Sequence, residues 1–187
     1  MRNIDPDKPL PQIHHREIVA RSKLFRVEQV DLEFSNGATR QFERMAGTNR
    51  GAVMIVPMLD ADTMILIREY AAGTHSYQLG FPKGLIDPGE SPLEAANREL
   101  QEEAGFGANV LHDIHQVSMA PTFFNATMNI VIASDLYEKR LPGDEPEPLE
   151  VVTWPLAEAD ALLAREDFIE ARCIAALLLA QKWLKEQ

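Results

Sequence analysis

One stretch constrains this chain more than any other: GLIDPGESPLEAANRELQEEAGF, from Gly84 to Phe106. It holds six carboxylates and one arginine, a net charge of −5, whereas the whole chain of 187 residues carries −11. Like charges at the spacing of helical neighbours destabilise a fold. The crowding therefore indicates that something positive binds to this stretch.

Local signals place a helix inside the stretch. Ser91 is suited to the N-cap, Pro92 to the first helical position, and Glu94 completes a capping box. Gly105 is suited to end the helix. The pattern predicts a helix over 92–104, with one apolar stripe that faces a core and consists of Leu93, Ala96, Leu100 and Ala104.

The carboxylates on this helix share one side of it. Glu99, Glu102 and Glu103 fall within one arc at spacings of three and four residues. Arg98 lies four residues before Glu102 and can hold its side chain in one rotamer. Oxygen ligands in this number favour a hard cation, Mg²⁺ or Mn²⁺, which binds one or two carboxylates together with substrate phosphates.

The three glutamates alone are also compatible with a solvated acidic helix face. The preceding loop favours the metal, because Gly84 and the Pro88-Gly89-Glu90 turn add a fourth carboxylate that can fold back on the helix. A purely structural calcium site leaves Gly84 and Arg98 unexplained. The sequence therefore predicts a metal site and, beyond the metal, a phosphate ester.

Composition narrows the possible partners and surroundings. The sequence pI of about 4.9 disfavours long nucleic acids, but not a small phosphorylated ligand, since a bound metal reverses the local sign of charge. The single cysteine, Cys173, excludes an internal disulfide and a cysteine-rich zinc site. No signal-peptide pattern or membrane-spanning run is visible, so we expect a cytoplasmic protein with no membrane partner.

The N-terminal part predicts a small antiparallel sheet. Residues 1 to about 15 are rich in proline and are interpreted as an arm. Strands are expected at 18–22, 25–34 and 39–45, with a tight turn at 35–37. The apolar positions change phase within 25–34, which suggests a bulge in that strand.

The remainder predicts an α/β arrangement. The apolar runs 52–58 and 63–69 are interpreted as a hairpin buried on both faces. Further strands are expected near 110–119, 127–135 and 151–154, and helices at 156–164 and 168–184. A proline-rich acidic loop, RLPGDEPEPLE, occupies 140–150.

The stretch resembles the signature of the Nudix hydrolases. Nine positions match it, with an aromatic residue only at the last, where an aliphatic one is usual: Gly84, Glu90, Arg98, Glu99, Leu100, Glu102, Glu103, Gly105 and Phe106. The resemblance implies an α/β fold, the Nudix α/β/α sandwich with a mixed sheet, over 48–187. It also implies that the arm and small antiparallel sheet, 1–47, serve dimerisation, as in the ADP-ribose pyrophosphatases.

The resemblance also implies roles for the acidic residues. Glu99 and Glu103 would be the inner metal ligands, and Glu102 would bind a second ion or a water on the metal. The backbone carbonyl of Lys83 would add a ligand. Arg98 and Glu90 would orient these groups.

Substrate contacts and a general base lie elsewhere in the chain. Arg44 and Arg68 are candidate phosphate contacts, and Pro121 and Phe123 belong to a loop expected near the site. In related pyrophosphatases a glutamate on a mobile loop is the base, which here indicates first Glu147 and second Glu145. The alternative for each is a solvated acid in a proline-rich connection.

The expected function is metal-dependent hydrolysis of the diphosphate in ADP-containing compounds, such as ADP-ribose, diadenosine polyphosphates and NADH, with release of AMP or ADP. We expect Mg²⁺, or Mn²⁺, as cofactor and a homodimer. Ala71-Ala72 follow Tyr70 where many ADP-ribose pyrophosphatases carry an arginine, which favours a broad choice of substrate.

Two other functions stay open at this point. One is a Nudix hydrolase of capped RNA or nucleoside triphosphates, and the other is a non-catalytic sensor of ADP-ribose or NAD.

Overall fold

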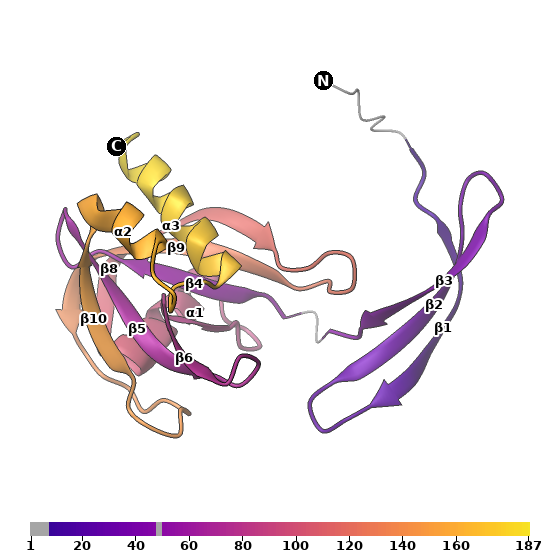
Figure 1. The fold of residues 1–187 in the computed structure, drawn as a ribbon, viewed down its shortest axis with the longest axis horizontal. Helices are drawn as coiled ribbons and strands as arrows, with labels where there is room; N and C mark the ends of the chain where they lie inside the picture. The colour runs from indigo at the N-terminus through magenta and orange to yellow at the C-terminus, as the bar shows by residue number, and fades with distance from the viewer. Residues whose placement is uncertain (1–7, 48–49) are drawn as a thin grey trace. The chain divides into compact units, whose positions relative to one another are not determined.

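The computed structural model describes residues 8–47 and 50–187, which form two units (Figure 1). The first unit contains the N-terminal residues together with Ala120–Ala126, and the second contains Arg50–Met119 and Thr127–Gln187. The predicted division between 47 and 48 stays a prediction. The predicted arm falls partly on residues 1–7, outside the described residues, and its end is wrong because a strand already begins at Gln12.

The first unit is built on a three-stranded antiparallel sheet. Its strands are β1 (Gln12–Arg21), β2 (Arg26–Glu33) and β3 (Thr39–Met45), in the order β1-β2-β3. The predicted bulge in the second strand is wrong: β2 pairs with β3 without a shift, and both irregularities lie between β1 and β2. Most side chains of this sheet are only partly buried. Burial therefore does not require the apolar residues of β2 to stay on one face of the sheet.

The second unit contains two sheets. The first has the order β7-β4-β9-β8, from β4 (Ala52–Pro57), β7 (Lys83–Leu85), β8 (Phe106–Ser118) and β9 (Thr127–Glu138). It is mixed, since β4 and β9 are parallel. The second sheet has the order β10-β5-β6, from β5 (Thr63–Ala71), β6 (Ser76–Gly80) and β10 (Glu150–Pro155).

The predicted hairpin of 52–58 and 63–69 is wrong. The two runs are strands, and both are buried on two faces, but they belong to different sheets and share one isolated bridge, Met58 to Met64. Burial on both faces indicates that a strand is central in its sheet, but it does not identify the neighbouring strands. β4 pairs with β9 and β7, whereas β5 pairs with β10 and β6.

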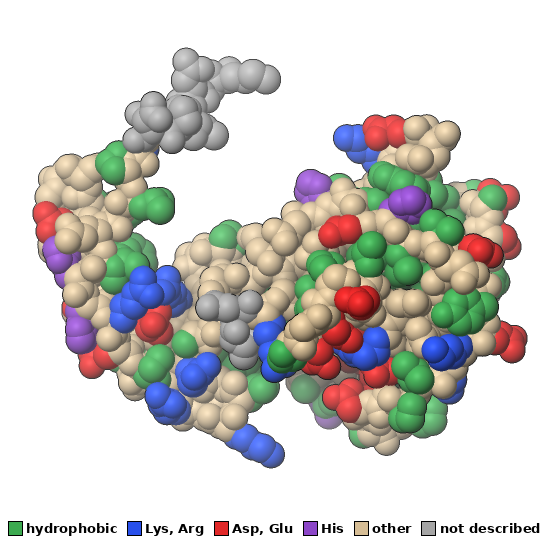
Figure 2. All heavy atoms as spheres, turned by 180° about the vertical axis from the view of Figure 1, so that it is seen from behind, with side chains coloured by type: hydrophobic (Ala, Val, Ile, Leu, Met, Phe, Trp, Pro, Cys, Tyr) green, Lys and Arg blue, Asp and Glu red, His purple; other side chains and the backbone are tan. Residues whose placement is uncertain are grey.

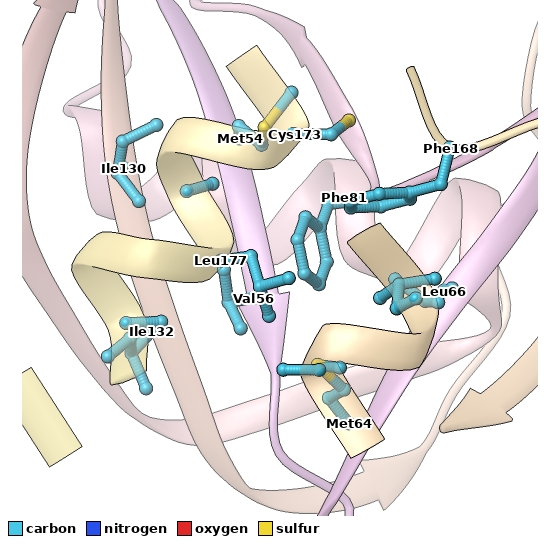
Figure 3. Close-up of a cluster of buried hydrophobic side chains, with 14 of the residues drawn as sticks. Met54, Val56, Met64, Leu66, Phe81, Ile130, Ile132, Phe168, Cys173 and Leu177 are labelled. Atoms are coloured by element: carbon cyan, nitrogen blue, oxygen red, sulfur yellow. The ribbon is translucent and has the colours of Figure 1, made fainter. Parts of the chain in front are cut away.

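Helices cover both faces of this layer. One face carries α1 (Pro92–Glu99) and the π-helical turn η1 (Leu100–Ala104); the other carries the 3₁₀ turn η2 (Leu156–Glu158), α2 (Ala159–Leu163) and α3 (Ala171–Leu184). Alternate residues of β4 serve the two cores. Met54 and Val56 pack with Leu177 (Figure 3), whereas Val53 packs with Leu100 on the α1 side. The predicted α/β/α sandwich is confirmed.

The helix that carries the glutamates differs from its prediction in its second half. Ser91 and Glu94 form the predicted capping box, and Gly105 ends the helix with φ 78°. The last turn is π-helical rather than α-helical. Leu93 was expected on the buried stripe but is 37% exposed, and Ala95 is buried instead. No helix in the described ranges is both long and apolar enough to cross a membrane.

Candidate active site

The predicted loop–helix stretch lines a pocket of about 650 Å³ in the second unit. Four segments surround it: β5, the strand β7 with the loop that follows it, the helix α1–η1, and the proline-rich connection between β9 and β10. Its charged lining residues are mostly acidic; they are Glu69, Asp87, Glu99, Glu102, Glu103, Asp144 and Glu145, against Lys83 and Arg98.

Arg98 organises the carboxylates on the outer side of this pocket. Its Nε and Nη2 donate to the two oxygens of Glu90 at 2.9 and 3.0 Å, a bidentate pair. Its Nη1 donates to Glu99 at 2.7 Å and to Glu102 at 2.8 Å, and Nη2 also reaches the carbonyl of Leu85 at 2.9 Å. The predicted contact between Arg98 and Glu102 is therefore present, and the arginine ties the loop to the helix.

Three carboxylates, those of Glu69, Glu99 and Glu103, lie against the strand β7. The backbone N–H of Lys83 donates to Glu103 Oε2 at 2.8 Å, and its ammonium group makes a close ion pair with Glu69. A Cβ on Gly84 would overlap the carboxylate of Glu99. Glycine at this position is what allows Glu99 to lie directly on the loop.

Burial changes the protonation of the two inner glutamates. It raises the pKa of Glu99 to about 7, an effect that Arg98 opposes and that nearby Glu102 and Asp144 reinforce. It raises the pKa of Glu103 to about 8, although the ammonium and the N–H of Lys83 favour the charged form. One buried carboxyl, Glu103, and one half-buried carboxyl, Glu99, both with raised pKa values, lie beside further acids in a site that is short of positive charge.

The donor set fits a divalent cation. Carboxylate oxygens and backbone carbonyls are the ligands that Mg²⁺ and Mn²⁺ take in proteins. Within residues 8–47 and 50–187, no three acidic, histidine or cysteine side chains converge on one point as they stand. Glu99 and Glu102 are turned to Arg98, and Glu103 to Lys83. Rotation of these side chains towards the pocket would be needed for a shared ion.

The proline-rich connection brings further acids to the pocket. Asp144 and Glu145 line it together with Pro142, Gly143 and Pro146. The sequence did not single out Asp144; its position in the same acidic loop was the available signal. Glu147, the first choice for a base, is not among the lining residues, and its carboxylate instead accepts a short hydrogen bond from the Tyr77 hydroxyl.

Arg68 lies away from the lining of this pocket. It donates to Glu150 at 2.8 Å and to Asp167 at 2.6 Å, so its charge is already paired within the second unit. Its role as a phosphate contact stays a prediction, as do the roles of the other predicted site residues.

Three predicted substrate contacts belong to the first unit. Arg44 lies on β3 and pairs with Glu28 on β2 at 2.7 Å. Pro121 and Phe123 lie in the segment 120–126, where the Phe123 carbonyl accepts from the N–H of Met45 at 2.8 Å.

The fold and the pocket define a class of protein, one that uses a metal ion to bind phosphates. A helix rich in glutamate follows a glycine loop on an α/β/α sandwich, and it presents oxygen ligands suited to a metal that binds phosphates.

Comparisons with known proteins agree with this class. The NUDIX domain family matches residues 48–177, and the NudE-type Nudix hydrolase N-terminal domain matches 11–44. The chain is 63% identical to the ADP compounds hydrolase NudE of Escherichia coli strain K12, over 95% of each chain. It is 32% identical to the ADP-sugar pyrophosphatase of Mus musculus, over 80% of this chain and 78% of that one.

A solved structure, the crystal structure of an ADP compounds hydrolase, superposes with a TM-score of 0.91 at 63% identity over 95% of both chains. The chain belongs to the Nudix family. It is a hydrolase that acts on pyrophosphate bonds and, like Nudix hydrolases generally, uses divalent metal ions.

Proposed function

We propose that this hydrolase cleaves the diphosphate of ADP-containing small molecules, among them ADP-ribose, diadenosine polyphosphates and NADH, and releases AMP or ADP. The observation that carries the proposal is the 63% identity, over 95% of each chain, to a protein named as an ADP compounds hydrolase. The acidic pocket supports it, because a diphosphate needs a cation to approach seven carboxylates.

The inner glutamates Glu99 and Glu103 would hold the cation, with Glu102 and the carbonyl of Lys83 as further ligands. Mg²⁺ is the proposed ion, with Mn²⁺ as a substitute. When bound, it supplies neutralisation of the diphosphate and stabilises charge on the leaving phosphate. Arg98, through Glu90, keeps the loop and the helix in one arrangement while substrate binds.

The group that accepts a proton during the reaction would lie in the connection between β9 and β10. A carboxylate there, Glu145 or Glu147, would accept the proton of the water that attacks one phosphorus. The bond from that phosphorus to the bridging oxygen breaks, and the bridging oxygen leaves with the second phosphate. Arg44, Arg68, Pro121 and Phe123 remain the proposed contacts for the rest of the substrate.

We also propose a cytoplasmic homodimer. The N-terminal sheet exposes apolar side chains, with Phe42 at 44% and Val19 at 43% exposure. Residues 8–47 carry seven Lys and Arg against five Asp and Glu, whereas 48–187 carry ten against 22. Figure 2 shows Lys and Arg side chains on the N-terminal unit. A basic sheet in one copy is complementary to the acidic unit of another.

Light scattering of the purified chain tests the dimer. A mass of twice 21.0 kDa is expected, with dissociation favoured at high salt because screening weakens charge pairing. A mass of 21.0 kDa at all concentrations would contradict the proposal.

The activity is tested by following release of AMP in the presence of Mg²⁺ from ADP-ribose, diadenosine triphosphate, NADH and a capped dinucleotide. Turnover of several ADP compounds is expected, with a loss of about 10²-fold or more in Glu103→Gln. Preference for the capped dinucleotide would point to a different substrate class. Metal-dependent binding of ADP-ribose without turnover would make the protein a sensor.

A further inference from the structure

The connection between β9 and β10 is rich in proline and is held at both ends. At one end the N–H of Leu141 donates to the carbonyl of Gln101 at 3.1 Å, next to the glutamate-bearing turn. At the other end Leu149 packs against the core cluster on the α1 side. Between them lie three prolines, which fix their own φ angles and remove backbone donors; they are Pro142, Pro146 and Pro148.

The acids of this loop point to two different places. Asp144 and Glu145 line the glutamate pocket, and the carboxylate of Glu145 lies where a Cβ on Gly143 would stand. Glu147 is outside that lining, and its carboxylate accepts from the hydroxyl of Tyr77. One carboxylate thus faces the site while another, two residues on, contacts the sheet.

Tyr77 is itself held by its neighbours in the sheet. It lies directly opposite Tyr70 in the pairing of β5 with β6. The two rings meet at 65° with centroids 5.8 Å apart, an edge-to-face arrangement. The Tyr70 hydroxyl lies 2.7 Å from His75 Nδ1. The side chain whose hydroxyl meets Glu147 therefore packs against an aromatic neighbour on the adjacent strand.

We propose that the Tyr77–Glu147 hydrogen bond is a latch that holds the 142–148 loop so that Glu145 faces the glutamate pocket. Glu147 and Tyr77 are then positioning residues, and Glu145 is the carboxylate that accepts the proton. In a loop with three prolines and two fixed ends, one bond at residue 147 leaves few ways to turn Glu145 away. This inference rests on the proposed function for the role of Glu145.

Glutamine at position 147 separates the two possible roles of Glu147. Its amide carbonyl still accepts from Tyr77 but is no base. With ADP-ribose as substrate, Glu147→Gln is expected to keep kcat within about threefold, whereas Glu145→Gln lowers it about 10²-fold or more. A fall of about 10²-fold in Glu147→Gln, with Glu145→Gln nearly unchanged, would make Glu147 the base and overturn the proposal.

Removing the latch itself gives a smaller, defined effect. Tyr77→Phe and Glu147→Ala are each expected to lower kcat about threefold to tenfold with KM within about twofold, because substrate still binds. The double variant is expected to match either single one, since both remove one interaction. Tyr137→Phe, which removes a hydroxyl on β9, is the control and keeps full activity. Additive losses in the double variant would contradict the latch.

A second readout does not depend on catalysis. Hydrogen exchange at the amides of Gly143, Asp144, Glu145 and Glu147 is expected to quicken in Tyr77→Phe and Glu147→Ala, but not in Glu147→Gln. Unchanged exchange in all three variants would overturn the latch. If the wild-type chain hydrolysed none of the substrates, the proposed function would fail, and exchange would still decide whether the loop is held at residue 147.

Discussion

At the scale of single residues, the site depends on one arginine and one glycine. Arg98 contacts Glu90, Glu99 and Glu102 together. One guanidinium group, with five N–H donors, therefore holds three carboxylates in place. Gly84 provides the space in which Glu99 lies. The acidic residues supply the ligands, but these two residues decide where the ligands stand.

We expect Gly84→Ala to remove most of the activity. The added Cβ would overlap the Glu99 carboxylate, so either the loop or the glutamate must move. The expected result is a kcat reduced about tenfold or more, with the free energy of unfolding little changed, because the overlapping atoms are the end of a flexible side chain. Steady-state kinetics and urea denaturation measure the two effects.

Gly73→Ala is the matched control. A Cβ there meets nothing within 4 Å, and the φ of Gly73 is not in the left-handed region. Equal activity of Gly84→Ala and wild type would show that Glu99 does not need its present place.

At the scale of elements, the α1–η1 helix is the part that turns sequence into a site. A capping box begins it and Gly105 ends it, both as the sequence predicts. Its last turn is π-helical: the N–H of Gly105 bonds the carbonyl of Leu100, five residues back. The wider turn leaves Gln101 and Glu103 both buried, at 5% exposure each. In a regular α-helix, two residues at this spacing, such as Gln101 and Glu103, point to nearly opposite sides.

Ser91→Ala is expected to loosen the start of this helix. The Ser91 side chain accepts from the N–H of Glu94, and the Glu94 carboxylate accepts from the N–H of Ser91 at 2.8 Å. Loss of the hydroxyl should lower the free energy of unfolding by about 1 kcal/mol, as measured in urea. Ser91→Thr keeps the acceptor and should retain most of the stability. If both variants unfolded at the wild-type midpoint, the cap would contribute nothing.

At the scale of the whole molecule, charge is distributed unevenly. The net charge is −11, yet residues 8–47 alone are net positive, so the acids concentrate in the unit that holds the pocket. Within that unit the effect of burial on the two inner glutamates outweighs the cation beside each of them, Arg98 at Glu99 and Lys83 at Glu103. Stability of the metal-free protein should therefore depend on their protonation.

We expect the metal-free protein to lose stability as the pH rises from 5 to 8. The pKa values of Glu99 and Glu103, about 7 and about 8, lie above the usual 4.5, so the folded state binds more protons than the unfolded state in this range. Each such group contributes at most about 1.4 kcal/mol per pH unit. The Tm in EDTA should fall by roughly 3 °C or more.

Two comparisons test the origin of this dependence. Glu103→Gln in EDTA should show a flatter pH profile, because one of the two raised groups is gone. Mg²⁺ should raise the Tm more at pH 8 than at pH 5, since it binds the ionised carboxylates. A Tm in EDTA that rose between pH 5 and 8 would contradict the prediction.

Features that depend on local spacing were predictable from the residues alone. The cap at Ser91, the stop at Gly105 and the contact of Arg98 with Glu102 all involve residues within four positions, and all are confirmed. The Nudix family is confirmed for the same reason, because its signature is a spacing within one loop and one helix.

Contacts between distant segments, in contrast, follow from the packing of the whole fold. The apolar runs indicate that β4 and β5 are buried, but the residues with which they pair lie up to 92 positions away, and the two strands belong to different sheets. Glu145 and Glu147 share one proline-rich loop, and the sequence ranks Glu147 before Glu145 as the base. Their separation, one to the pocket and one to Tyr77, depends on a strand 70 residues earlier. Local spacing carries no information about such contacts, because they are set by how the sheets and loops pack.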